Sequence, residues 1–404
     1  MTVARNGVFA TRRTRQRQVS ELFAAAYLRY ARYINPFSHQ RGSLMDVLPW
    51  LQLQQQTAQR WHGPLLNQRW VLVGMRGWKR RQLRQFWGLH PELVTFDVPP
   101  QAGDQVLCWG AKAPQGAWRV EDGFVRSVGL GSDLIPPMSL VLDKRGIYFD
   151  PSRPSDLEHL LEHHLFTPKE MAEAQAVRHV MVEQGITKYN LEPLQAVVWP
   201  SAGQRVLLVP GQVEDDDSVR LGCTDIHTNL GLLQAVRQAH PQAFIVYKPH
   251  PDVVTGNRAG RVASAQALQW ADHVETQASV VSCIQACDEL HTLTSLSGFD
   301  ALLRGKPVTT YGLPFYACWG LTTDVAGAHP CFERRTRRLS LDELVAGALL
   351  LYPFYWDHQL KGATTCMAVL LKIRAQRDKL HAEDRLKHLK HGFWRRIWRK
   401  WRNL

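Results

Sequence analysis

Residues 205–252 decide the fold, and they include RVLLVPGQVEDDDSVRLG (205–222) and TNLGLLQAVRQAHPQAFIVYKPHPD (228–252). Two short runs, Val206–Val209 and Phe244–Tyr247, are rich in branched and aromatic residues and therefore indicate strands. Between them, apolar residues recur at helical spacing over Leu230–Gln238. This succession predicts a β-α-β unit whose two strands lie parallel in one sheet.

Polar residues follow both strands of this unit. The acidic run Glu214–Asp217 comes after the first strand, and the run Lys248–Pro251 comes after the second. In open α/β sheets, ligands bind beyond the carboxyl ends of parallel strands. We therefore expect the carboxylates, Lys248 and His250 to share one site, suited to transfer chemistry at a phosphate-activated substrate.

The composition is that of a globular protein. With 404 residues the chain can form two domains, and its hydrophobic content of 45% argues against disorder. The seven cysteines are widely spread and match no zinc-binding spacing, so we expect a reducing, cytoplasmic compartment. No apolar run approaches 18 residues, which predicts the absence of a transmembrane helix.

The net charge of +13 is concentrated at the two ends of the chain. Residues 1–42 carry +7 and residues 385–404 carry +8, which leaves the other 342 residues at −2. A near-neutral body argues against nucleic acid as a partner, and basic ends favour docking on a surface.

The last twelve residues, FWRRIWRKWRNL (393–404), form the clearest amphipathic pattern in the chain. Aromatic and aliphatic residues fall on one helical face, and Arg and Lys fall mostly off it, as in helices that lie at a membrane interface. The pattern predicts peripheral binding to an anionic inner-membrane surface. A helix that packs on the protein body or on a partner is the alternative.

Strand and helix patterns alternate in both halves, which predicts an α/β fold with two Rossmann-like domains facing a cleft and extra helices at both ends. We expect a basic helical segment over residues 1–60, one domain over 61–190, a second over 191–345 and helices over 346–404. Besides the two strands above, the strand candidates are Trp70–Val73, Leu93–Val98, Gln105–Trp109, Leu140–Leu142, Ile147–Phe149 and Val308–Tyr311.

Two polar corners are candidates for phosphate binding. Pro249 and Pro251 stiffen the first, so that Lys248 and His250 project from it; a turn with a solvated Lys is the alternative. The second, SLSGFDALL (295–303), places two hydroxyls and a glycine where an apolar helix begins. Such a helix end binds phosphate through free N–H groups, although Ser297 as a simple N-cap is the alternative.

Two acidic groups are candidates for catalysis. The run Glu214–Asp217 follows a strand, and Glu121 and Asp122 precede a glycine in the other half. A nucleophilic carboxylate that faces an acid/base carboxylate is typical of retaining glycosyl chemistry. A solvated loop and an ordinary turn are the alternatives. No Asp-x-Asp pattern ends a strand as it does in metal-dependent sugar transferases, so we expect a site without metal or cofactor.

Four segments together resemble the bacterial capsule-assembly β-Kdo transferases of the KpsC and KpsS type, which build a Kdo linker on a phospholipid. They are EDGFVRSVGLGSDLIPPMSLVLDKRGIYFDPSRPSDLE (121–158), VPGQVEDDDSVRLG (209–222), VYKPHPDV (246–253) and TSLSGFDALLRGKPVTTYGLPFYACWGLT (294–322). The match covers one transferase module, whereas the KpsC type usually carries two. Residues 1–60 and 360–404 lie outside it.

The resemblance implies a GT-B-like retaining transferase that takes Kdo from CMP-β-Kdo and needs no metal. By motif, Asp216 is the implied nucleophile, with Asp215 as the alternative, and Glu121 is the implied acid/base, with Asp122 as the alternative. The implied nucleotide pocket comprises Gln212, Lys248, His250, Pro251, Ser295, Ser297, Gly298 and Asp300. The implied acceptor is a phospholipid-linked Kdo at the inner membrane, with other capsule-assembly proteins as further partners.

Three residues of the matching segments need separate comment. Arg126 is a candidate to bind the Kdo carboxylate bidentately, and a salt bridge within its own loop is the equal alternative. Family members commonly carry Glu where this chain has Asp300, which shortens a contact to the ribose, and Gly where it has Cys318.

Two other functions stay open. An inverting transferase of the CMP-sialic-acid type shares the acidic pair before glycine and the His-Pro, although the run Gln212–Ser218 favours retention. A non-catalytic scaffold in a capsule-assembly complex is the other. The linkage, the acceptor length and the oligomeric state do not follow from the sequence.

Overall fold

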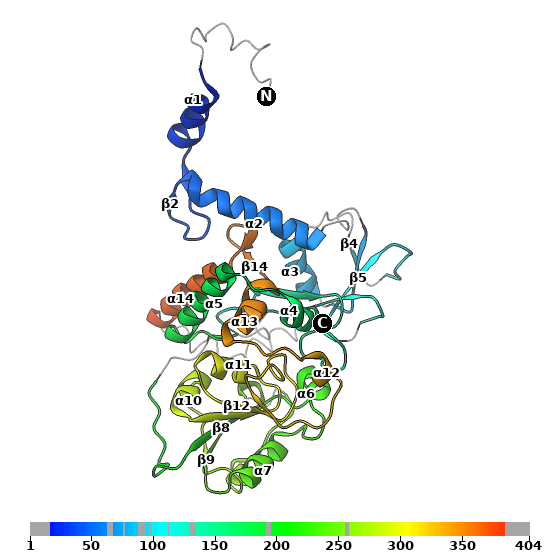
Figure 1. Ribbon diagram of the computed structural model, residues 1–404, viewed down its shortest axis with the longest axis vertical. Coiled ribbons are helices and arrows are strands. Elements are labelled where there is room, and N and C mark those ends of the chain that lie inside the picture. The colour runs from blue at the N-terminus through cyan, green and yellow to red at the C-terminus, as the bar shows by residue number, and fades with distance from the viewer. Residues whose placement is uncertain are drawn as a thin grey trace. The chain divides into compact units, whose positions relative to one another are not determined.

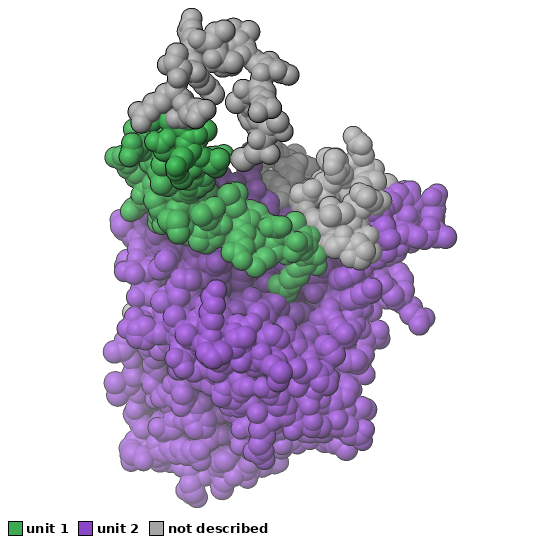
Figure 2. All heavy atoms as spheres, turned by 45° about the horizontal axis from the view of Figure 1, so that its top comes forward, with its two compact units in different colours: residues 1–63 green, residues 64–404 purple. Residues whose placement is uncertain are grey.

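The computed structural model describes residues 17–62, 68–75, 77–87, 94–96, 98–111, 113–129, 135–190, 195–254 and 258–383. The chain forms two compact units, residues 1–63 and 64–404 (Figure 2). The arginines before residue 17 and the amphipathic tail 393–404 lie outside the described residues, so the membrane-docking prediction stays a prediction. In the described ranges, no helix is both long enough and apolar enough to cross a bilayer.

The described part of the first unit, residues 17–62, is mainly helical, as the sequence predicts for this part of the chain. Its elements are α1 (Val19–Phe23), the π-helix η2 (Ala24–Tyr30), the paired strands β1 (Tyr33–Ile34) and β2 (Arg41–Gly42), and α2 (Leu44–His62).

The second unit contains two sheets and the remaining helices (Figure 1). Its helices are α3 (Gly77–Trp87), α4 (Asp156–His163), α5 (Pro168–Glu183), α6 (Asp217–Gly222), α7 (Asn229–Ala239), α8 (Pro251–Val254), α9 (Ser264–Ala267), α10 (Val280–Ala286), α11 (Leu296–Leu303), α12 (Cys331–Arg334), α13 (Leu341–Val345), the π-helix η6 (Ala346–Leu351) and α14 (Cys366–Ala382).

The predicted β-α-β unit is the centre of a parallel sheet of six strands in the described residues, ordered β10-β9-β8-β11-β12-β13. The strands are β8 (Val206–Pro210), β9 (Phe244–Lys248), β10 (His273–Val274), β11 (Glu289–Thr292), β12 (Val308–Thr310) and β13 (Thr323–Asp324). This is the Rossmann order, which reverses direction between β8 and β11. The Rossmann prediction is therefore confirmed for this half.

Strand β8 is an unbroken apolar run because helices cover both of its faces. Leu208 belongs to the core that α10 and α11 also line, whereas Leu207 belongs to a second core with α7. In Figure 1, α10 and α11 accordingly lie on one side of β8 and α7 lies on the other.

The other sheet is mixed rather than Rossmann-like, with seven strands in the order β15-β14-β7-β6-β5-β3-β4 within the described residues. The strands are β3 (Trp70–Val73), β4 (Val94–Phe96), β5 (Gln105–Trp109), β6 (Trp118–Asp122), β7 (Ser139–Asp143), β14 (Pro353–Asp357) and β15 (Gly362–Thr364). Strands β4, β3, β5 and β6 run parallel, and β7, β14 and β15 add antiparallel pairs.

Two local predictions are wrong, and one strand was missed. Residues 346–404 are not all helical, because β14 and β15 pair onto the edge of the mixed sheet. The apolar run Ile147–Phe149 lies in a turn closed by the bond from the Asp150 N–H to the Ile147 carbonyl, and it supplies core side chains without a ladder partner. Strand β6 was not expected, and it carries the first acidic pair.

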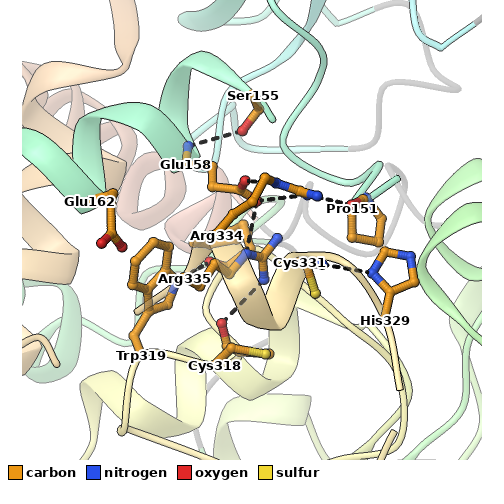
Figure 3. A network of polar contacts seen from close by, with 12 residues as sticks. Pro151, Ser155, Glu158, Glu162, Cys318, Trp319, His329, Cys331, Arg334 and Arg335 are labelled. Atoms are coloured by element: carbon orange, nitrogen blue, oxygen red, sulfur yellow. Dashed lines mark hydrogen bonds and ion pairs between the residues drawn. The ribbon is translucent and has the colours of Figure 1, made fainter. Parts of the chain in front are cut away.

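One hydrophobic core extends between the two sheets, since Phe124 and Val141 of the first half belong to the same buried cluster as Leu208 of the second. A buried ion-pair cluster also ties the chain after β13 back to α4 (Figure 3). There, Arg334 and Arg335 both donate to the carboxylate of Glu158, which is 5% exposed.

Candidate functional site

The first acidic pair ends β6. The Oε1 atom of Glu121 accepts hydrogen bonds from the indole of Trp109 at 3.0 Å and from the Asp122 N–H at 2.9 Å. Burial is the main cause that raises the pKa of Glu121, and the charge of Asp122 adds to it, whereas Lys79 and Lys188 oppose the shift. A carboxyl group held in this way suits acid/base work near neutral pH.

Arg126 forms the salt bridge within its own loop. Its side chain is fully buried, its Nε donates to Asp122 at 2.7 Å and its Nη1 donates to Ser127 at 2.9 Å. Asp122 is thereby occupied as well, which favours Glu121 as the acid/base of the pair. Binding of a substrate carboxylate by Arg126 stays a prediction.

The four carboxylates after β8 have separate surroundings. Glu214 accepts from the N–H of Asn229 at the start of α7 at 2.7 Å, and Asp215 is 57% exposed beside Arg258. Asp216 caps α6: its Oδ1 accepts from the N–H of Ser218 at 3.0 Å and from the hydroxyl of the same residue at 2.7 Å. Its other oxygen is 3.9 Å from Arg258.

Gly110 separates the acidic groups of the two halves. A Cβ added there would lie 3.9 Å from Oε2 of Glu121 and 3.9 Å from Oδ2 of Asp217, the first residue of α6. The two carboxylates are therefore no more than twice that distance apart. The structure thus brings the end of β6 close to the start of α6.

Tyr148 lies close to both Glu121 and Asp216. Burial raises the pKa of Tyr148 well above its ordinary value, and the charges of Glu121 and Asp216 act on it together, while Lys188 opposes them. Its ring packs edge-on against Phe124, with centroids 4.8 Å apart. Asp216 is therefore within electrostatic reach of the residues that surround Glu121.

The corner after β9 is close to Asp216. His250 Nδ1 accepts from the Asp252 N–H at 3.2 Å, and Pro251 opens α8. Burial lowers the pKa of His250, while Asp252 and Asp216 oppose the shift. Because Nδ1 of His250 accepts the Asp252 N–H, its Nε2 is the atom that can donate a hydrogen bond to a ligand. Lys248, 7% exposed at the end of β9, supplies the positive charge.

Gln212 lies at the reversal point between β8 and β11 and holds the two strand ends together. Its amide donates to the hydroxyl of Thr294 at 3.1 Å, and its Oε1 accepts from the Thr294 N–H at 2.9 Å. Its backbone bonds both ways with the side chain of Asn229. These bonds make Gln212 a residue that shapes the pocket; its predicted contact with the nucleotide stays a prediction.

The serine corner forms the start of α11. The Oγ atom of Ser295 accepts from the Ser297 N–H at 3.1 Å and donates to the hydroxyl of Ser297 at the same distance. A Cβ at Gly298 would lie 2.2 Å from the hydroxyl of Tyr316, so only glycine fits there. Ser295 is therefore the N-cap, and the capping role considered for Ser297 belongs to its neighbour instead.

Asp300 points into the protein. It is 5% exposed, burial raises its pKa to about 6, and Arg304 at 4.0 Å opposes the shift. A contact from this carboxylate to a ribose stays a prediction.

Sequence reasoning missed four residues of this site. Tyr148 lies on a segment expected to be a strand, and Lys188 and Tyr189 follow α5 where no strand end marks them. Asp217 belongs to the predicted acidic run but was not singled out within it. Neither the spacing nor the residue types of Tyr148, Lys188 and Tyr189 could have placed them beside Glu121.

Among the described residues, no three His, Cys, Asp or Glu side chains converge as a metal site would require. The cations that act on these carboxylates are Lys79 and Lys188 beside Glu121 and Arg258 beside Asp216.

Taken together, the fold and site define an α/β protein with a Rossmann-ordered half, in which carboxylates, a histidine corner and a serine corner meet at the ends of parallel strands. Residues 110–197 and 181–355 match the model of the family described as capsule polysaccharide biosynthesis protein. The chain belongs to this family.

The chain is also similar in sequence to curated polysaccharide-related proteins. The capsule polysaccharide modification protein LipA of Neisseria meningitidis serogroup B is 42% identical over 388 residues, which are 91% of this chain and 54% of LipA. The lipopolysaccharide-processing protein LpsZ of Rhizobium meliloti is 42% identical over 271 residues, which are 66% of this chain and 60% of LpsZ. The chain thus spans about half the length of LipA.

Two solved structures are similar to the chain. The β-Kdo 2,7 transferase of Thermosulfurimonas dismutans KpsC is 34% identical, with a TM-score of 0.63 over 76% of this chain and 99% of that one. The β-Kdo 2,4 transferase of the same KpsC is 32% identical, with a TM-score of 0.66 over 75% of this chain and 97% of that one. The resemblance to KpsC-type proteins is therefore confirmed.

Proposed function

We propose that the chain is a retaining β-Kdo transferase that moves Kdo from CMP-β-Kdo to a lipid-linked or Kdo-terminated acceptor in capsule linker synthesis. The observation that carries this proposal is the short distance between Glu121 and the start of α6, where Asp216 and Asp217 lie. The charge of Asp216 also acts on His250. The similarity to two KpsC Kdo transferases supports the choice of sugar.

In the first step, the carboxylate of Asp216 attacks the anomeric carbon of Kdo, and CMP leaves with the electron pair of the broken bond. Lys248 compensates the charge of the departing phosphate, and His250 and the hydroxyls of Ser295 and Ser297 donate hydrogen bonds to it. In the second step, Glu121 accepts the proton of the acceptor hydroxyl, whose oxygen displaces Asp216. The product keeps the β configuration of the donor.

Asp217 is a rival to Asp216 in this scheme. Its Oδ2 is the oxygen whose distance from a Cβ at Gly110 shows that it lies near Glu121. Its other oxygen forms an ion pair with Arg220 at 2.5 Å. An inverting transferase would need neither as a nucleophile, because the acceptor would attack the donor directly.

The test is incubation with CMP-β-Kdo and a synthetic Kdo-terminated lipid acceptor. Mass spectrometry of the product reports transfer, and NMR reports the configuration of the new linkage. A β-linked product supports the proposal, and an α-linked product favours the inverting alternative. An intact donor after prolonged incubation would favour the scaffold. Metal independence is tested by the same assay after treatment with EDTA.

Membrane docking completes the proposal, because a lipid-linked acceptor lies at the membrane. The basic, aromatic composition of residues 393–404 supports it. Deletion of residues 391–404 should weaken binding to anionic vesicles more than turnover on a short soluble acceptor. Unchanged vesicle binding would reject docking through the tail.

A further inference from the structure

A sugar acid places a special demand on this site. In Kdo the carboxylate is attached to the reacting carbon, so an attacking Asp216 meets a second anion at the point of bond formation. Two carboxylates that meet at one carbon atom repel each other strongly unless a cation or hydrogen-bond donors lie beside them. The sequence suggests Arg126 as that cation, but its Nε and Nη1 are engaged by Asp122 and Ser127, which leaves only its buried Nη2 for a substrate.

Lys188 is the cation that the structure adds at this place. It lies on the segment between α5 and the Rossmann half, and that segment is fastened to the loop after β6. The amide of Asn190 donates to the Ser127 carbonyl at 3.1 Å, and the Gly129 N–H donates to the Tyr189 carbonyl at 2.8 Å. Asn190 adopts a left-handed backbone with φ of 53° to make these contacts.

Both carboxylates and aromatic rings surround the Lys188 side chain. Its ammonium lies 5.7 Å from the ring centroid of Tyr189, and the charges of Glu121 and Asp122 act on it. Burial opposes its charge, but Tyr189, Tyr148 and these carboxylates together raise its pKa, so it stays protonated.

Among the described residues, no carboxylate comes within ion-pair distance of Lys188. A half-buried ammonium without an ion-pair partner is costly, and an anionic group of a substrate would relieve that cost. The charges of Lys188 and Asp216 both act on the phenol of Tyr148, so both side chains lie near this ring. The donor sugar has to lie in this region if Asp216 and Glu121 act on opposite sides of one carbon.

We propose that Lys188 binds the carboxylate of the donor sugar acid, an inference that rests on the Kdo transfer proposed above. Lys188 is then a specificity residue. It increases the affinity for sugar nucleotides whose anomeric carbon carries a carboxylate and does not increase the affinity for those of neutral sugars. It also offsets the repulsion between that carboxylate and Asp216 as the covalent bond forms.

The test compares Lys188→Met, Lys188→Arg and the control Lys144→Met, which removes an exposed lysine directly after β7. For each protein, the KM for CMP-β-Kdo and the inhibition constant of CMP are measured. Loss of one charge-assisted contact should raise the KM of Lys188→Met about 10- to 100-fold. The inhibition constant of CMP should stay within about twofold, because CMP lacks the carboxylate. Lys188→Arg should recover part of the donor affinity, and Lys144→Met should match the wild type.

The outcomes separate the two proposals. If the wild type transfers Kdo and Lys188→Met keeps its donor KM, or loses CMP and donor affinity equally, the role of Lys188 is overturned while the function stands. If the wild type binds CMP but never uses CMP-β-Kdo, the proposed function fails and the inference fails with it. Should the Met variant not fold, as judged by its thermal unfolding, the Arg variant decides instead: a raised donor KM with an unchanged CMP constant supports charge pairing, and parallel losses of both contradict it.

Discussion

Asp217 and Glu121, from different halves of the second unit, approach the same backbone glycine: a Cβ on Gly110 would lie 3.9 Å from a carboxylate oxygen of each. Gly110 has φ of +76°, a conformation that glycine adopts without strain in the turn after β5. Its lack of a side chain also leaves the space between the two acidic groups open. The two oxygens are therefore at most twice 3.9 Å apart. This bound includes both the roughly 5–5.5 Å typical of retaining sites and the lower part of the roughly 6.5–9.5 Å typical of inverting ones.

The first prediction distinguishes the neighbouring aspartates. Asp216→Asn keeps an oxygen for the Ser218 contacts but removes the nucleophile, so transfer should fall about 10³-fold or more. Asp215→Asn, which changes an exposed residue beside Arg258, should stay within about threefold of the wild type. The rate of Kdo transfer is measured for both. If Asp217→Asn loses activity and Asp216→Asn keeps it, the nucleophile is Asp217.

The second prediction concerns pH. Burial and Asp122 raise the pKa of Glu121, and Lys79 and Lys188 oppose the shift. As a base, Glu121 must be deprotonated, so the acidic limb of the kcat profile should lie above the ordinary glutamate pKa of about 4.3. Lys188→Met removes a cation that stabilises the carboxylate and should move this limb to higher pH.

The matched measurement is the kcat–pH profile of Glu121→Gln. Its residual rate should lack the acidic limb. A limb that persists at the same pH in Glu121→Gln would assign it to another group, and an unshifted limb in Lys188→Met would show that Lys188 does not act on Glu121.

The third prediction concerns the buried ion-pair cluster of Figure 3. Glu158→Ala leaves the guanidinium of Arg335, whose side chain is 2% exposed, without its carboxylate. Removal of one partner from such a pair costs about 3–5 kcal/mol of the free energy of unfolding. Urea unfolding measures this loss. The exposed pair of Arg17 and Glu21 is the control, since Glu21→Ala should cost less than about 1 kcal/mol. Equal effects of the two variants would contradict the structural role of Glu158.

The fourth prediction tests the serine corner. Gly298→Ala forces a methyl group to within 2.2 Å of the hydroxyl of Tyr316, a fully buried side chain that has no room to move. Such overpacking costs about 1–3 kcal/mol and shifts the backbone that carries Ser295 and Ser297, so CMP affinity should fall with stability. Gly77→Ala, with no described neighbour within 4 Å of the added atom, is the matched control. Undiminished CMP affinity in Gly298→Ala would place the nucleotide away from this corner.

The Rossmann half was predictable because its strands are short apolar runs with a helical pattern between them, and their ends carry the polar residues. The mixed sheet was only partly predictable. Its β6 strand, WRVED, is as polar as a loop and forms because its neighbours β5 and β7 supply ladder partners on both sides. Strands β14 and β15 come from the far end of the chain, and no local sequence pattern predicts that β14 pairs with the distant strand β7.

The site divides in the same way. Asp216 and His250 follow predicted strands, where position alone suggests function, whereas Glu121 was suggested by its place in an acidic pair before a glycine. The state of His250 was not predictable, since its burial and the hydrogen bond that its Nδ1 accepts from the Asp252 N–H are tertiary features. Lys188 lies on an irregular segment, and hydrogen bonds of residues 188–190 with the loop after β6 bring it to the acidic pair.

The central claim is that Asp216 forms a covalent bond to Kdo. The most direct measurement is mass spectrometry of the Glu121→Gln variant after incubation with CMP-β-Kdo alone, since this variant should form the adduct and release it slowly. The account predicts one Kdo on the peptide that contains Asp216, lost again when an acceptor is added. An adduct confined to another residue, or no adduct together with an α-linked product from the wild type, would contradict it.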